Sequence, residues 1–88
     1  MRFDVVLAEL RLFKSRTQAS LAVQDGAALL NGAVVKPGHG VKPGDLITLV
    51  GPAGTRTCEV LALPRASLSR AAARELLREV SLEPPAGA

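Results

Sequence analysis

The chain turns a corner at Phe13-Lys14-Ser15-Arg16-Thr17-Gln18, a short basic stretch between two segments whose apolar residues recur at helical spacing. Ser15 and Gln18 fit a capping box, in which side chains satisfy two backbone amides at the start of a helix. This pattern predicts a helix that begins at about Arg16 and runs to about Gln24. Gly26 can adopt the left-handed conformation that ends many helices, so we expect the helix to stop there.

The segments around this corner predict a small α+β domain with two N-terminal helices packed on a small antiparallel sheet and a C-terminal helix. Apolar residues at positions 3, 6, 7 and 10 predict a first helix over residues 3–12. Asn31-Gly32 predicts a hairpin turn between strands at residues 28–30 and 33–35. Further strands are expected at residues 46–50 and 55–63, the second with Cys58, Val60 and Ala62 on one face.

The C-terminal helix is expected to begin at Ser67 or Ser69 and to end at about Val80. Its apolar face would carry Leu68, Ala72, Leu76 and Val80. Arg70, Arg74 and Arg78 would form a basic stripe along the same helix, either as a second contact for a polyanion or as a solvated face beside acidic residues. We expect one domain over residues 1–82 and a disordered tail over residues 83–88.

Composition limits the classes of protein that the chain can belong to. It has 88 residues and a net charge of +3, which suits one domain with a mild preference for polyanions. The single Cys58 excludes an internal disulfide and a multi-cysteine zinc site. The sequence shows neither a signal peptide nor a transmembrane span, so a cytoplasmic location is expected.

The corner itself is the candidate functional feature. Backbone amides at a helix start lack partners within the helix, and the helix dipole adds partial positive charge there. Lys14 and Arg16 add full charges beside it, and this combination can bind a phosphate. The same residues also fit an ordinary capped helix with solvated basic side chains, and composition and spacing leave both interpretations open.

The order of several short motifs resembles the S4-type RNA-binding domain, or alpha-L motif. These motifs are Arg2-Phe3-Asp4, Phe13-Lys14-Ser15-Arg16, Asp25-Gly26, Asn31-Gly32, Val35-Lys36-Pro37 and Pro43-Gly44-Asp45-Leu46-Ile47. Within this family, the chain is most similar to the stand-alone, ribosome-associated proteins of the heat-shock-protein-15-like subfamily. The resemblance covers roughly residues 2–50 and continues more weakly beyond them.

The resemblance implies a set of residues that contact RNA. Arg2, Lys14, Ser15 and Arg16 would face phosphates and sugars, with Gln18 close by. Asn31 and Lys36 would flank the same surface, although for Asn31 the turn position alone is the stronger explanation. The implied partner is structured RNA, in particular ribosomal RNA or the large ribosomal subunit.

Two other functions stay open at this point. Relatives commonly carry basic residues where this chain has Val5 and Leu21, so the fold could serve protein interaction with a weakened hold on RNA. The chain could also be an accessory partner of an RNA-modifying enzyme. No residue pattern supports catalysis, because Ser15 and Cys58 have no basic partner placed near them by the sequence. We expect no cofactor, metal, membrane or small-molecule substrate.

Overall fold

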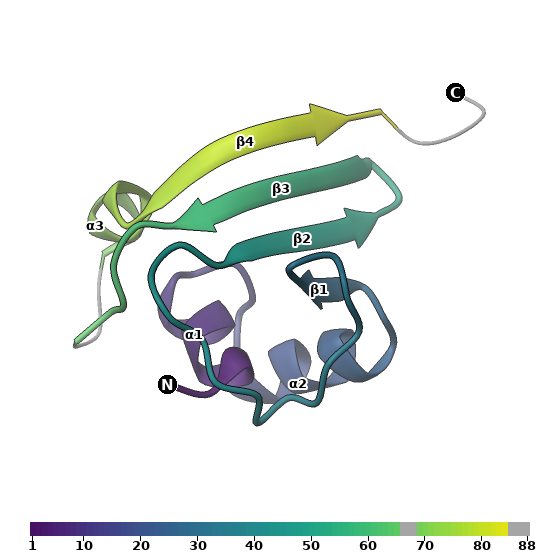
Figure 1. The fold of residues 1–88 in the computed structure, drawn as a ribbon, viewed down its shortest axis with the longest axis horizontal. Helices are drawn as coiled ribbons and strands as arrows, with labels where there is room; N and C mark the ends of the chain where they lie inside the picture. Colours follow the sequence, from purple (N-terminus) through teal and green to yellow (C-terminus); the bar gives the residue numbers. More distant parts are fainter. Residues whose placement is uncertain (66–68, 85–88) are drawn as a thin grey trace.

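The computed structural model describes residues 1–65 and 69–84 of the chain. Along the chain the elements are α1 (Phe3–Glu9), α2 (Arg16–Gln24), β1 (Ala28–Leu30), β2 (Leu46–Gly51), β3 (Gly54–Val60), α3 (Arg70–Glu75) and β4 (Leu77–Glu83). The strands form one antiparallel sheet in the order β1-β2-β3-β4. Helices α1 and α2 lie beside β1 and β2, while α3 sits at one end of β3 and β4 (Figure 1). The α+β class and its arrangement, two N-terminal helices, an antiparallel sheet and a C-terminal helix, are confirmed.

The core fills the space between the two N-terminal helices and the sheet. It is aliphatic apart from Phe3, whose side chain is fully buried. Its buried apolar members are Phe3, Val6, Leu7, Leu10, Ala19, Val23, Ala28, Leu30, Val41, Ile47 and Val60. Burying one side chain of the size of Leu or Ile stabilises the fold by roughly 1.5–3 kcal/mol. This core fixes α1 against α2 and therefore holds the corner between them in place.

Both N-terminal helices end in the same hydrogen-bonded motif, but with different residues. After α2, Gly26 takes φ +76°, and the amide of Ala27 donates to Ala22 O at 2.9 Å. After α1, Arg11 takes φ +62°, and the amide of Leu12 donates to Leu7 O at 3.0 Å. These bonds satisfy carbonyls at the helix ends. The stop of α2 at Gly26 is confirmed, whereas α1 ends at Glu9, before the predicted residue 12, because Arg11 leaves the helical conformation.

The turn at Asn31-Gly32 forms, but the predicted hairpin does not extend from it. Both residues have positive φ, and Leu30 and Ala33 exchange two backbone hydrogen bonds across the turn. The chain then leaves the sheet, so the predicted strand over residues 33–35 is wrong. Strand β1 pairs with β2 instead, with Leu30 opposite Ile47. The following loop lies beside the start of α1, where its carbonyls accept hydrogen bonds from the helix amides.

The C-terminal part differs most from the prediction. Helix α3 ends at Glu75 and the chain continues as β4, so the predicted helix to Val80 is wrong, and Val80 is 45% exposed. Strand β3 would otherwise present unpaired backbone groups at the edge of the sheet, and β4 pairs with it from Thr55↔Glu83 to Val60↔Leu77.

Some expected features lie at or beyond the described segments. Ser69 caps α3 by accepting from the Ala72 amide at 3.2 Å. The alternative start at Ser67 and the apolar position at Leu68 lie outside the described residues. Strand β4 includes Glu83, the first residue of the expected tail, while residues 85–88 are also outside. Strand β3 ends at Val60, earlier than predicted, and Ala62 is exposed. Among the described helices, none is long and apolar enough to cross a membrane.

Candidate nucleic-acid interface

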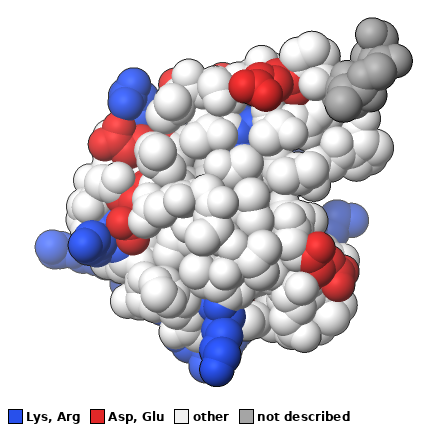
Figure 2. Space-filling view, turned by 45° about the vertical axis from the view of Figure 1, so that its right-hand side comes forward, with Lys and Arg blue, Asp and Glu red and all other residues white. Residues whose placement is uncertain are grey.

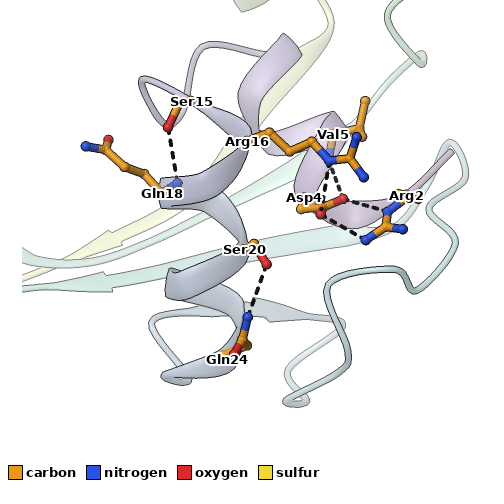
Figure 3. A network of polar contacts seen from close by, with 8 residues as sticks. All are labelled: Arg2, Asp4, Val5, Ser15, Arg16, Gln18, Ser20 and Gln24. Carbon is orange, nitrogen blue, oxygen red and sulfur yellow. Dashed lines mark hydrogen bonds and ion pairs between the residues drawn. The ribbon is translucent and has the colours of Figure 1, made fainter.

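A buried carboxylate organises the basic corner. Asp4, in the first turn of α1, is only 2% exposed. Its carboxylate accepts hydrogen bonds from Nε and Nη2 of Arg2, both at 3.1 Å, and from Nε of Arg16 at 3.4 Å. The Val5 amide donates to the same carboxylate at 2.8 Å. Figure 3 shows the two arginines converging on Asp4 from opposite sides, one from the N-terminus and one from the start of α2.

The ionised form of Asp4 is favoured in this setting. Burial alone would raise the pKa of Asp4, because burial disfavours a charge. The hydrogen bonds from Arg2 and the Val5 amide, the charge of Arg2 and the bond from Arg16 outweigh burial and lower this pKa. The same contacts with Asp4 raise the pKa of the Arg2 guanidinium. Asp4 is therefore a charged anchor for both arginines.

The start of α2 is capped as the sequence predicts. Ser15 has extended backbone angles, and its Oγ accepts from the Gln18 amide at 3.2 Å. The side chain of Gln18 extends away from Ser15 (Figure 3). The structure therefore shows the Ser15 half of the predicted capping box. Lys14, Ser15, Arg16 and Gln18 are all exposed. The site thus offers two cations and two neutral polar side chains on the surface at one helix start.

A groove runs from this corner along α2. It has a volume of about 480 Å³ and is lined by Arg2, Asp4, Arg16, Thr17, Ser20, Leu21 and Gln24. Its floor holds the Asp4 carboxylate, while the side chains of Arg2 and Arg16 remain 52% and 57% exposed. Gln24 donates from Nε2 to Ser20 Oγ at 3.1 Å further along α2. The residues that line the groove are therefore polar or charged, apart from the exposed Leu21.

The loop before β2 brings Lys36 to the same region. The amides of Phe3 and Asp4 donate to His39 O at 2.9 Å and to Pro37 O at 3.0 Å. These bonds satisfy the first amides of α1, so the cationic character of the corner comes from side chains and from the start of α2. A Cβ added at Gly38 would lie 3.5 Å from Arg2 Cζ, which shows that the loop passes directly beside the guanidinium.

Comparison with known proteins shows the family of the chain. A family model for the S4 domain matches residues 1–47, more than half of the 88-residue chain. The chain belongs to the S4 domain family. An S4 domain is an RNA-binding domain, so the corner of this S4 domain is its candidate interface with RNA.

Two solved structures resemble this S4 domain over most of its length. Heat shock protein 15 of Vibrio cholerae matches with a TM-score of 0.86 and 28% identity, covering 92% of this chain and 82% of that chain. The hypothetical protein HP1423 matches with a TM-score of 0.77 and 29% identity, covering 92% of this chain and 98% of that chain. No curated protein sequence matches. The similarity therefore extends beyond the matched S4 segment into the sheet.

Asn31 has a structural role in this S4 domain. Its Oδ1 accepts from the Leu46 amide at 2.9 Å, and its Nδ2 donates to Asp45 Oδ1 at 3.3 Å. Asp45 is itself buried and accepts from the Lys42 amide at 3.0 Å. The side chain of Asn31 thus ties the turn after β1 to the start of β2. Contact between Asn31 and RNA remains a prediction from the resemblance.

Two basic residues that the predicted site omitted lie next to it in the S4 domain. Arg11 and Arg70 line a second hollow together with Lys14. The left-handed backbone of Arg11 could not be foreseen, because the sequence pattern extended α1 past it. Arg70 was noticed only as part of a stripe that does not form, since Arg78 lies in β4 and is paired with Glu59 at 2.6 Å.

The thiol of Cys58 lies inside the fold. Cys58 is 2% exposed, as predicted for a structural thiol. Burial raises the pKa of the Cys58 thiol, and the nearby charge of Arg56 offsets only part of that effect. Within residues 1–65 and 69–84, no group of His, Cys, Asp and Glu side chains is arranged to hold a metal ion.

Proposed function

We propose that this S4 domain binds structured RNA, in particular ribosomal RNA or a ribosomal particle, through phosphate contacts of the corner between α1 and α2. The observation that carries the proposal is the pair of arginines, Arg2 and Arg16, which the buried Asp4 of α1 holds from opposite sides. Lys14, Ser15 and Gln18 are exposed at the same helix start, and Lys36 and Asn31 are expected to extend the surface.

The anchored arginines suit phosphate recognition for two reasons. Each guanidinium carries five N–H donors in a planar fork. Asp4 engages Nε and Nη2 of Arg2 and Nε of Arg16, and both side chains stay about half exposed. Donors therefore remain for phosphate oxygens. Because Asp4 already restrains both side chains, binding RNA requires less loss of their conformational freedom.

The choice of ribosomal RNA rests on the resemblance to the ribosome-associated subfamily, supported by the structural similarity to heat shock protein 15 of Vibrio cholerae. Phosphate contacts give affinity and geometry but no base sequence, so the shape of a folded RNA would determine selectivity. This function needs no cofactor and no catalytic residue. It also fits the cytoplasmic location expected from the sequence.

A pair of matched variants tests the proposal. Lys14→Glu with Arg16→Gln lowers the charge of the corner, while Arg65→Glu with Arg74→Gln changes the net charge equally at exposed positions that line neither basic hollow. Fluorescence anisotropy with a ribosomal RNA hairpin measures affinity. With three to five phosphate contacts, the log–log salt slope of the unchanged protein should be about −2 to −4.

We expect the corner variant to lose at least about tenfold in affinity and the control variant to stay within about twofold. Thermal unfolding of both variants shows whether they remain folded. A corner variant that unfolds like the unchanged protein and still binds RNA with the original affinity would rule out this interface.

A second candidate function has an observation of its own. An apolar hollow of about 350 Å³ is lined by Leu12, Phe13, Ala27, Leu49, Val50, Gly51, Ala53, Gly54, Arg56 and Leu82. Leu82 is 70% exposed at this hollow. Figure 2 likewise shows a face whose middle is largely uncharged, with both basic and acidic residues around it. Such a surface is typical of protein interaction.

Purification from cells distinguishes the two functions. Association with ribosomal particles that nuclease abolishes would support RNA binding. A nuclease-resistant protein partner, or an RNA-modifying enzyme recovered in its place, would favour the alternatives. Substituting Leu82 by Ser should release such a protein partner and leave RNA affinity unchanged.

A further inference from the structure

A second basic hollow lies on the other side of the start of α2. Its volume is about 240 Å³, and it is lined by Arg11, Leu12, Phe13, Lys14 and Arg70. Its three cations come from separate parts of the chain: the residue after the C-cap of α1, the joint before α2, and the first residue of α3. Only the tertiary fold brings Arg70 to this place.

The side chains of this hollow gather three positive charges, those of Arg11, Lys14 and Arg70. The residues that line the second hollow include no Asp or Glu. Grouped like charges repel one another, and an anion placed among them removes that repulsion.

The backbone at Arg11 adds to this picture. Arg11 has φ +62° at the same position of the helix-ending motif where α2 has Gly26 at φ +76°. A left-handed conformation costs a residue with a side chain about 1–2 kcal/mol, a cost that glycine avoids. The fold therefore holds a cationic side chain at a position where glycine would be more stable. Residues kept in such conformations often belong to binding surfaces.

We propose that Arg11, Lys14 and Arg70 form a second phosphate-binding site, which takes a phosphodiester group of the same RNA that docks in the groove of Arg2 and Arg16. This inference rests on the proposed function and extends its interface onto α3. Lys14 and Arg16 flank Ser15 and line the two different hollows. Residues of the two hollows therefore lie close together at the start of α2, and a polymer with regularly spaced phosphates matches such a pair of sites better than a single small anion.

The test compares two arginines of the same short helix. Arg70→Gln removes a cation from the hollow, and Arg74→Gln removes an exposed cation that does not line it. Both variants have the same net charge. Anisotropy with the ribosomal RNA hairpin is measured across a range of salt concentrations. Loss of one phosphate contact should weaken binding by about three- to tenfold and make the salt slope shallower by about 0.7–0.9.

We expect this change for Arg70→Gln and none for Arg74→Gln. In nuclear magnetic resonance titrations of the unchanged protein, the Nε–Hε signal of Arg70 should shift with RNA while that of Arg74 stays in place. Equal affinities and equal slopes for the two variants would overturn the second site. If the unchanged protein does not bind the hairpin at all, the proposed function fails instead, so the two failures are distinguishable.

Discussion

Asp4 shows how one buried side chain can prepare a surface for binding. Of the two buried carboxylates of the described chain, Asp4 and Asp45, it is the one that faces cations. A buried charge is tolerated only when it is paired and hydrogen-bonded, and Asp4 has both kinds of partner. It therefore links the stability of the fold to the position of Arg2 and Arg16.

Asp4→Asn should reveal this link through its dependence on pH. At neutral pH we expect the free energy of unfolding to fall by about 1–3 kcal/mol, because charge-assisted hydrogen bonds are lost. The pKa of Asp4 is lower in the fold than its unfolded value of about 3.9. Its contribution to stability is therefore complete above that value and is lost as the pH falls through the folded pKa.

Urea titrations of the protein and of Asp4→Asn measure this effect. The difference in stability between them should be constant from about pH 7 to pH 5 and shrink below about pH 4. A difference that keeps its full size well below about pH 3 would show that the charge of Asp4 does not stabilise the fold.

Asn31 allows its backbone and side-chain roles to be separated. Asn31→Gly keeps the positive φ but loses the bonds to Leu46 and Asp45, and it should lower stability by about 1 kcal/mol. Asn31→Ala also strains the backbone, and about 2 kcal/mol is expected. Chemical denaturation compares the two, and equal losses would contradict the backbone role. The RNA affinity of the Gly variant tests the predicted contact with RNA, which an unchanged affinity would exclude.

At the scale of the elements, the turn between β2 and β3 packs closely against the end of β4. Gly54 has φ +131°, and a Cβ there would overlap the carbonyl oxygen of Glu83. Gly32 has φ +78°, but nothing lies within 4 Å of a Cβ at that position. Substitution by Ala therefore adds backbone strain at both sites and a steric conflict only at Gly54.

We expect Gly32→Ala to lower the stability by about 1 kcal/mol and Gly54→Ala by more than about 2 kcal/mol. Amide exchange should become faster at the end of β4 in Gly54→Ala only, because the new methyl group pushes Glu83 away from the turn. Equal stability losses, with β4 protected in both variants, would contradict this packing.

At the scale of the whole molecule, the core does not stop where the S4 match stops. The match ends at residue 47, inside β2. However, Ile47 pairs with Cys58 of the neighbouring strand β3, and Val60 of β3 is fully buried. Leu76 and Leu77 also pack against the core. The first half of the chain alone therefore lacks part of the core that covers its apolar side chains.

A fragment of residues 1–51 should consequently stay largely unfolded at about 25 °C. It keeps α1, α2, β1 and β2 but loses β3, and a chain of this length buries too little surface for secure folding. Circular dichroism and thermal unfolding compare it with residues 1–84. A cooperative transition in the short fragment would show that the second half of the sheet is dispensable.

The sequence determined the features that depend on neighbours along the chain. Helix α2 has the predicted start and end, because a Ser15 cap and a Gly26 stop act within a few residues. The turn at Asn31-Gly32 and the buried Cys58 follow equally local rules. The corner with Lys14, Ser15 and Arg16 was found for the same reason.

The tertiary structure decided the features that depend on distant partners. Residues 77–83 form a strand because they pair with the edge of β3, although the spacing of apolar residues up to Val80 also fitted a helix. Arg70 reaches Lys14 and Arg11 only through that arrangement. Asp4 anchors Arg2 and Arg16 because the core packs α1 against α2. Backbone pairing across a sheet and ion pairs between helices link residues far apart in the chain, and no local pattern of amino acids records which of them will meet.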